Sequence, residues 1–130
     1  MAKHPSEVQI QRALRNLLQR GGEDAFVIIE EPESGKFVQF GGAPGLWLDL
    51  PCAALDEEEA DRAYKVFNEL GVEAPCEYHA SDSKAGMVRH GASFRLNLGD
   101  NVRAATSTAL AILRLVYLIP EDTALSIVEN

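Results

Sequence analysis

Residues 25–50 read AFVIIEEPESGKFVQFGGAPGLWLDL and carry the strongest strand signal in the chain. Their β-branched and aromatic residues fall into three short runs, a pattern that predicts three strands. The runs lie at residues 25–30, 36–40 and 46–50. The polar segment 31–35 ends in Gly35, which adopts positive φ without strain, so we expect it to close a hairpin.

Two amphipathic helices flank these strands. In the first, residues 6–20, apolar side chains recur at helical spacing behind a Ser6-x-x-Gln9 capping box. The second begins at Asp56, with Glu59 at the capping-box position, and ends before Gly71.

The rest of the chain adds two strands and a helix. Alternating residues predict strands at 76–79 and 92–98, and a third helix runs from a cap at Asp100 to about Leu118. This helix is apolar nearly all round, which predicts either a central core helix or one buried between the sheet and a partner. Residues from about 120 to 130 are expected to form a short acidic tail.

The predicted order is α-β-β-β-α-β-β-α. Short connections favour one mostly antiparallel five-stranded sheet, and the helices must bury their apolar stripes on it. The fold class is therefore α+β. The length of 130 residues suits a single domain, residues 1–130.

Pairing of the predicted strands suggests a surface for a partner. If Glu30 pairs with Lys36, then Phe26 and Ile28 face the core. The opposite face then carries four apolar residues among polar neighbours, as expected of a binding or dimer surface. These candidate partner-binding residues are Val27, Ile29, Phe37 and Trp47. The alternative is that a helix or the segment 72–91 covers this face, and a register slip of one residue would reverse the first strand.

Composition restricts the function. Twelve basic residues against twenty acidic ones give a net charge of -8, which disfavours binding to nucleic acid and to anionic membranes. Two cysteines are too few for a disulfide-rich secreted scaffold, and no signal peptide or stretch of about 20 apolar residues is present. We therefore expect a cytoplasmic protein.

No residue set predicts catalysis, a cofactor or a metal. Cys76, His79 and His90 supply too few ligands in close pairs for structural zinc, and Cys76 and His79 point to opposite faces of a strand. The acidic run 56–61 lacks the frame of a calcium loop, and residues 41–45 lack the Gly-Lys-Ser/Thr of a phosphate loop.

The order of elements resembles that of the class I type III secretion chaperones and their wider superfamily, which includes stand-alone bacterial relatives. The resemblance covers nearly the whole chain. Its most similar stretches are FVIIE at 26–30, FVQF at 37–40 and LRLVY at 113–117 before Pro120. It implies a secretion-chaperone-like, non-catalytic protein that binds a partner protein along apolar patches.

The same resemblance implies a homodimer. Dimers in that family typically form through the second helix and adjacent strands, so Tyr64 and Phe67 become the candidate interface residues, although both also fit the core stripe of the helix. A small acidic regulatory or immunity-type protein that blocks a basic partner is the alternative function. Strong salt dependence of association would favour that alternative.

Overall fold

The structure is a computed structural model that describes residues 5–22, 24–72, 76–82 and 87–130. The helices and strands are α1 (Pro5–Arg20), β1 (Phe26–Glu30), β2 (Phe37–Gly41), β3 (Leu46–Pro51), α2 (Glu57–Glu69), β4 (Cys76–Asp82), β5 (Met87–Gly99), α3 (Val102–Ala111) and β6 (Ser126–Glu129). A 3-10 turn (Cys52–Ala54) precedes α2, and a π turn named η2 (Ile112–Val116) follows α3.

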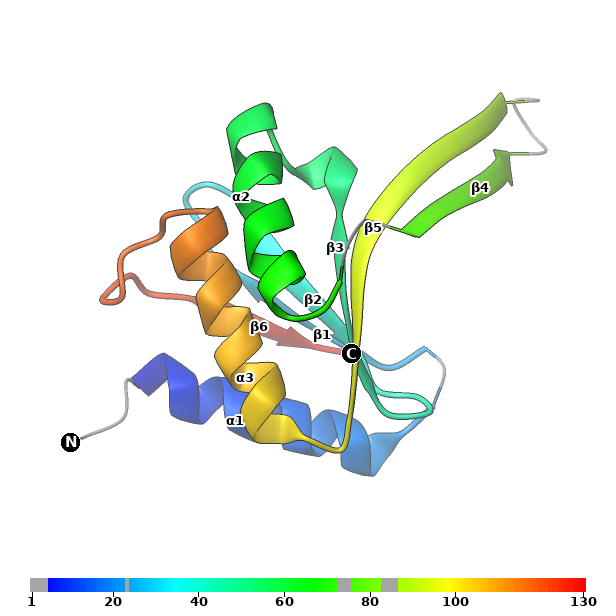
Figure 1. Ribbon diagram of the computed structural model, residues 1–130. Coiled ribbons are helices and arrows are strands. Elements are labelled where there is room, and N and C mark those ends of the chain that lie inside the picture. The colour runs from blue at the N-terminus through cyan, green and yellow to red at the C-terminus, as the bar shows by residue number, and fades with distance from the viewer. Residues whose placement is uncertain (1–4, 23, 73–75, 83–86) are drawn as a thin grey trace.

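The strands form one antiparallel sheet in the order β4-β5-β3-β2-β1-β6. The predicted α+β class, the predicted elements and their order are confirmed. The helices pack against one face of the sheet, and the β4–β5 hairpin extends beyond them (Figure 1). Buried side chains from that face and from all three helices form one core.

The expected acidic tail is wrong in its second half, because β6 adds a sixth strand to the sheet. Ile29 of β1 lies opposite Ile127, and Phe26 and Asn130 exchange two backbone hydrogen bonds of 2.9 Å. Leu125 and Ile127 pack against the core. This edge strand is short and has polar residues at both ends, so its sequence alone did not predict a strand. Its pairing with β1 stabilises it more than its own composition does.

The register of the first hairpin differs by one residue from the expected one. Glu30 lies opposite Phe37 rather than Lys36. The Glu31 carboxylate accepts the Ser34 N–H at 3.2 Å, and the backbone N–H of Gly35, at φ +74°, donates to the Glu31 carbonyl. The Glu31 N–H also donates to the Lys36 carbonyl at 2.9 Å, so the pairing is shifted by one residue and every side chain of β1 changes face.

The predicted helix starts are partly confirmed. Asp56 and Glu59 form the expected capping box of α2. The start of α1 is Pro5, so Ser6 lies inside the helix, and Pro is well suited to a first helical position. For α3 the cap is Asn101 instead of Asp100, because the Asn101 side chain accepts the Ala104 N–H at 3.0 Å.

The third helix ends in an unusual way. It widens into η2, and then Leu118 adopts the left-handed conformation at φ +59°. In this conformation the Ile119 N–H donates to the Leu113 carbonyl at 2.9 Å. A bond of this span closes many helix C-termini, and glycine normally occupies the left-handed position there. The Arg62 guanidinium donates to the Val116 carbonyl at 2.8 Å and ties this end to α2.

Phe67 belongs to the core, so its candidate role at a dimer interface is wrong. Its side chain is fully buried and stacks on Phe94 with ring centroids 4.6 Å apart. Tyr64 meets the same Phe94 ring edge-on at 5.1 Å but stays 46% exposed. Both residues lie on the apolar stripe of the helix, and only their packing against Phe94 of β5 shows that one is buried and the other exposed.

Truncation should show this difference. Phe67→Ala should lower the free energy of unfolding by about 3–5 kcal/mol, because it leaves a cavity between α2 and the sheet. Tyr64→Ala, the matched control on the same helix, should lower it by about 1 kcal/mol through loss of one aromatic contact. Urea unfolding of both variants measures this. Equal losses would contradict the assignment of Phe67 to the core.

Candidate functional site

The candidate site is the face of the sheet that points away from the helices, here called the outer face. The pairing of the strands places alternate residues of β1, β2, β3, β5 and β6 on it. Its apolar members are Phe26, Ile28, Phe37, Trp47 and Val128. No helix lies over this face within the part of the chain that the structure describes (Figure 1).

Two of the four predicted partner-binding residues lie elsewhere. Val27 and Ile29 are fully buried in the core, and Phe26 and Ile28 take their places on the outer face. The one-residue shift in the hairpin turn is the cause. Phe37 and Trp47 do lie on the outer face, and both are half-buried.

The prediction from the sequence did not include Val128, which is 41% exposed on β6 opposite Ile28. The alternation of Leu125, Ile127 and Glu129 on one side with Ser126 and Val128 on the other was the available signal. A run of five residues is too short for that alternation to predict a strand.

Trp47 lies flat across the sheet rather than pointing straight into solvent. Its ring covers Gly41, the cross-strand neighbour, at the position that a Cβ atom would occupy. The indole N–H donates to the Ala43 carbonyl at 3.2 Å. A glycine in a central strand leaves its backbone bare, and an aromatic ring over it restores the lost packing.

One cation accompanies this ring. The Arg95 guanidinium carbon lies 5.1 Å from the centre of the Trp47 ring, within the range of a cation–π contact. Arg95 also pairs with Asp49 at 3.4 Å, while 59% of its side chain stays exposed. The middle of the outer face therefore combines an aromatic ring with a partly exposed positive charge.

The second notable cluster is buried between β2, α2 and η2. The Glu59 carboxylate, 3% exposed, pairs with Lys36 and accepts the Asp56 N–H at 3.0 Å. The Tyr117 hydroxyl donates to the Phe37 carbonyl at 2.8 Å, and the Lys36 ammonium lies 5.6 Å from the centre of the Tyr117 ring. Each polar group in this cluster has a protein partner, so the arrangement suits a structural role.

Titration agrees with that role. Burial, and next the charge of Glu59, raise the pKa of Tyr117 to about 12, while the hydrogen bond to Phe37 opposes the rise. A tyrosine that keeps its proton at neutral pH is a poor general base. Burial and the charge of Asp49 also raise the pKa of Cys52, which disfavours the reactive thiolate.

The described residues contain neither a metal site nor a membrane-spanning helix. Among them no three His, Cys, Asp or Glu side chains come together in a way that could hold a metal ion. The side chains of Cys76, His79 and His90 lie outside the described part. In the described part, every helix is too short or too polar to cross a bilayer.

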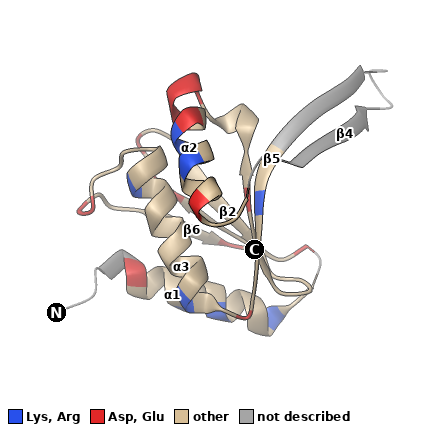
Figure 2. Cartoon of the chain, in the orientation of Figure 1, with Lys and Arg blue, Asp and Glu red and all other residues tan. Residues whose placement is uncertain are grey.

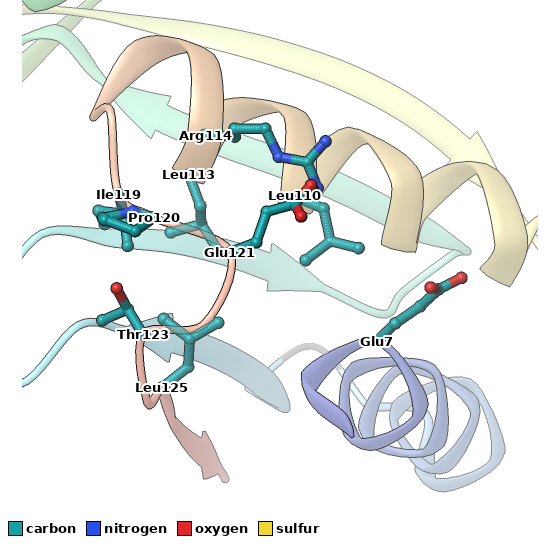
Figure 3. A pocket seen from close by; sticks show the side chains of 9 residues that line it. All are labelled: Glu7, Leu110, Leu113, Arg114, Ile119, Pro120, Glu121, Thr123 and Leu125. Atoms are coloured by element: carbon teal, nitrogen blue, oxygen red, sulfur yellow. The ribbon is translucent and has the colours of Figure 1, made fainter. Parts of the chain in front are cut away.

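A cavity of about 330 Å³ lies on the helix side of the sheet. It opens between the start of α1, the α3–η2 helix and the segment that leads to β6 (Figure 3). Aliphatic side chains and three charged ones line it. This cavity was not predicted, because its walls come from segments far apart in the sequence.

Comparison with known proteins gives no guide to these surfaces. No protein-family model matches the chain, and no significantly similar protein was found among curated sequences or solved structures.

A methyl group at position 41 should test how Trp47 is seated. Gly41→Ala would place the new Cβ inside the indole ring, so the ring must move, at a cost of about 1–3 kcal/mol in stability. The tryptophan emission, which comes from Trp47 alone, should shift to longer wavelength as the ring enters water.

Trp47→Ala supplies the control. Alone it should cost about 1–2 kcal/mol, less than truncation of a fully buried tryptophan. In the Trp47→Ala background, Gly41→Ala should cost almost nothing, because the clash is gone. Additive losses in the double variant would show that the ring does not depend on Gly41.

Proposed function

We propose that the protein is a non-catalytic protein-binding module that holds an apolar segment of a partner protein on its outer face. The single observation that supports this most is the position of Phe26, Ile28, Phe37 and Trp47 on a sheet face without a covering helix in the described part. Central sheet faces of this composition are normally packed against another layer.

The polar groups around these residues fit a binding surface. Gln39 and Asp49 lie opposite each other in the middle of the face, and Arg95 lies opposite Asp49. Apolar anchors surrounded by hydrogen-bonding groups are typical of protein interfaces. The partner segment is expected to place apolar side chains beside Phe37 and Trp47.

The resemblance to secretion chaperones supports the same function, since those proteins bind effector segments along apolar patches. We extend the proposal to a secretion-chaperone-like fold, a cytoplasmic location and a homodimer. Enzymatic activity and a cofactor are not part of it, because the buried Glu59 cluster is satisfied internally and the Cys52 thiol is disfavoured as a nucleophile.

Within the proposed dimer, Tyr64 is the remaining candidate from the second helix. Light scattering should give twice the chain mass of 14.2 kDa, and Tyr64→Arg should shift the mass toward that of one chain. A charged side chain without a partner at an interface is strongly unfavourable. Val8→Arg on α1, a residue of similar exposure, is the control that should keep the dimer. A single-chain mass for the wild type would refute the dimer.

The outer face can be tested with a partner protein that is captured from the native organism and purified. Calorimetry then measures its affinity for the wild type and the variants. The double variant Ile28→Ser/Phe37→Ser should weaken binding by about 2 kcal/mol or more, the threshold for hot-spot residues. Leu70→Ser, an exposed leucine at the end of α2, should leave the affinity unchanged.

Salt separates the proposed function from the acidic alternative. An apolar interface should bind almost equally at low and high salt, whereas a partner attracted by acidic residues should be lost at high salt. Figure 2 shows where such an attraction would act, because acidic residues gather at the start of α2. Salt-sensitive binding that tolerates Ile28→Ser/Phe37→Ser would overturn the outer-face proposal.

A further inference from the structure

The cavity beside α3 is part of a longer groove. The cavity is lined by Leu110, Leu113, Ile119 and Leu125 together with charged residues. A second hollow of about 310 Å³ shares three lining residues with it and continues along the same helix. The shared residues are Glu7, Leu110 and Arg114, and the second hollow adds Ser107, Ala111 and Leu115.

The groove has an apolar floor, and two leucines beside it are exposed to solvent. In Figure 3 the side chains of Leu113 and Leu125 extend toward each other across the cavity. Leu115 at the second hollow is 51% exposed, and Leu118 on the adjoining turn is 60% exposed. Leu118 also adopts a left-handed conformation in which glycine would be less strained.

The charges around the groove do not balance. Arg114 pairs with Glu121 at 2.7 Å, but both side chains are more than half exposed, so this surface pair is weak and easily exchanged. Glu7 faces the same groove from α1 and has no salt bridge within the described residues. Among the described residues that line the groove, two carboxylates face one guanidinium, which makes the rim negative above an apolar floor.

We propose that this groove binds a short amphipathic helix of a partner protein, with leucine-type side chains in the two hollows and lysine or arginine beside Glu7 and Glu121. Two adjoining hollows along a helix, each lined in part by leucine side chains, fit anchors one turn apart, as in other helix-in-groove complexes. The negative rim selects a basic helix. The groove lies on the helix side of the sheet, so this inference is independent of the proposed function.

The probes are two designed helical peptides of about 14 residues that share one leucine face. One carries lysine and the other glutamate at the remaining positions. Amide chemical shifts of the full chain report where each peptide binds, and fluorescence of labelled peptides gives the affinity. The lysine peptide should shift amides at residues 107–115 and 119–125, and it should bind more tightly than the glutamate peptide.

Charge variants give the directions. Glu7→Gln and Glu121→Gln should each weaken the lysine peptide about two- to fivefold, whereas Arg114→Gln should strengthen it by a similar factor. Leu115→Ala should weaken both peptides without unfolding the chain, because its side chain is exposed. Trp47→Ala should leave the affinity unchanged, which separates this groove from the outer face.

Three results would overturn the proposal. The first is a glutamate peptide, or an aliphatic carboxylate such as decanoate, that binds more tightly than the lysine peptide and is lost in Arg114→Gln. The second is a set of shifted amides on the outer face instead of residues 107–125. The third is the absence of any shift at millimolar peptide.

Discussion

The buried carboxylate of Glu59 joins three parts of the fold. One oxygen completes the capping box of α2 by accepting the Asp56 N–H, and the other pairs with Lys36, the residue before β2. Tyr117 packs beside this pair and donates to the Phe37 carbonyl at the end of the same hairpin. A carboxylate that is 3% exposed is tolerated only with its partners in place, so helix, hairpin and η2 are held in one arrangement.

That arrangement determines which surfaces remain free. Lys36 reaches Glu59 because it lies on the same face of β2 as Val38 and Phe40, the helix side. Phe37 must then lie on the outer face, together with Glu30, which lies opposite it on β1. The ion pair and the register of the hairpin therefore support each other, and a slip of one residue would break the pair and bury Phe37 instead.

Much of the fold could be predicted because its signals are local. Runs of β-branched residues, the Asp56–Glu59 capping box and helical apolar stripes each lie within a few residues, and these predictions are confirmed. The face of β1 could not be predicted in this way. It depends on whether the Glu31 carboxylate accepts a hydrogen bond from the turn, as it does from the Ser34 N–H at 3.2 Å. Such a bond forms only in a narrow range of distances and angles, which the sequence does not specify.

Other features depend on segments distant in the sequence. Phe67 is buried and Tyr64 is exposed because Phe94, from a strand formed later in the chain, stacks on one and only touches the edge of the other. Lys36 and Glu59 are 23 residues apart, and β6 is stabilised by pairing with a strand from the other end of the chain. The groove beside α3 has the same origin, since α1, η2 and the segment before β6 each contribute a wall.

The two candidate surfaces differ in the physical term that would drive binding. On the outer face, Asp49 is already paired with Arg95, so association there must come from burial of apolar side chains. At the groove, the unbalanced Glu7 adds a local attraction that reaches only about 8 Å at physiological ionic strength. The net charge of -8 therefore acts little on a distant partner, and the position of individual carboxylates decides which basic segment binds. Because the surfaces lie on opposite sides of the sheet, one partner segment could occupy each without displacing the other.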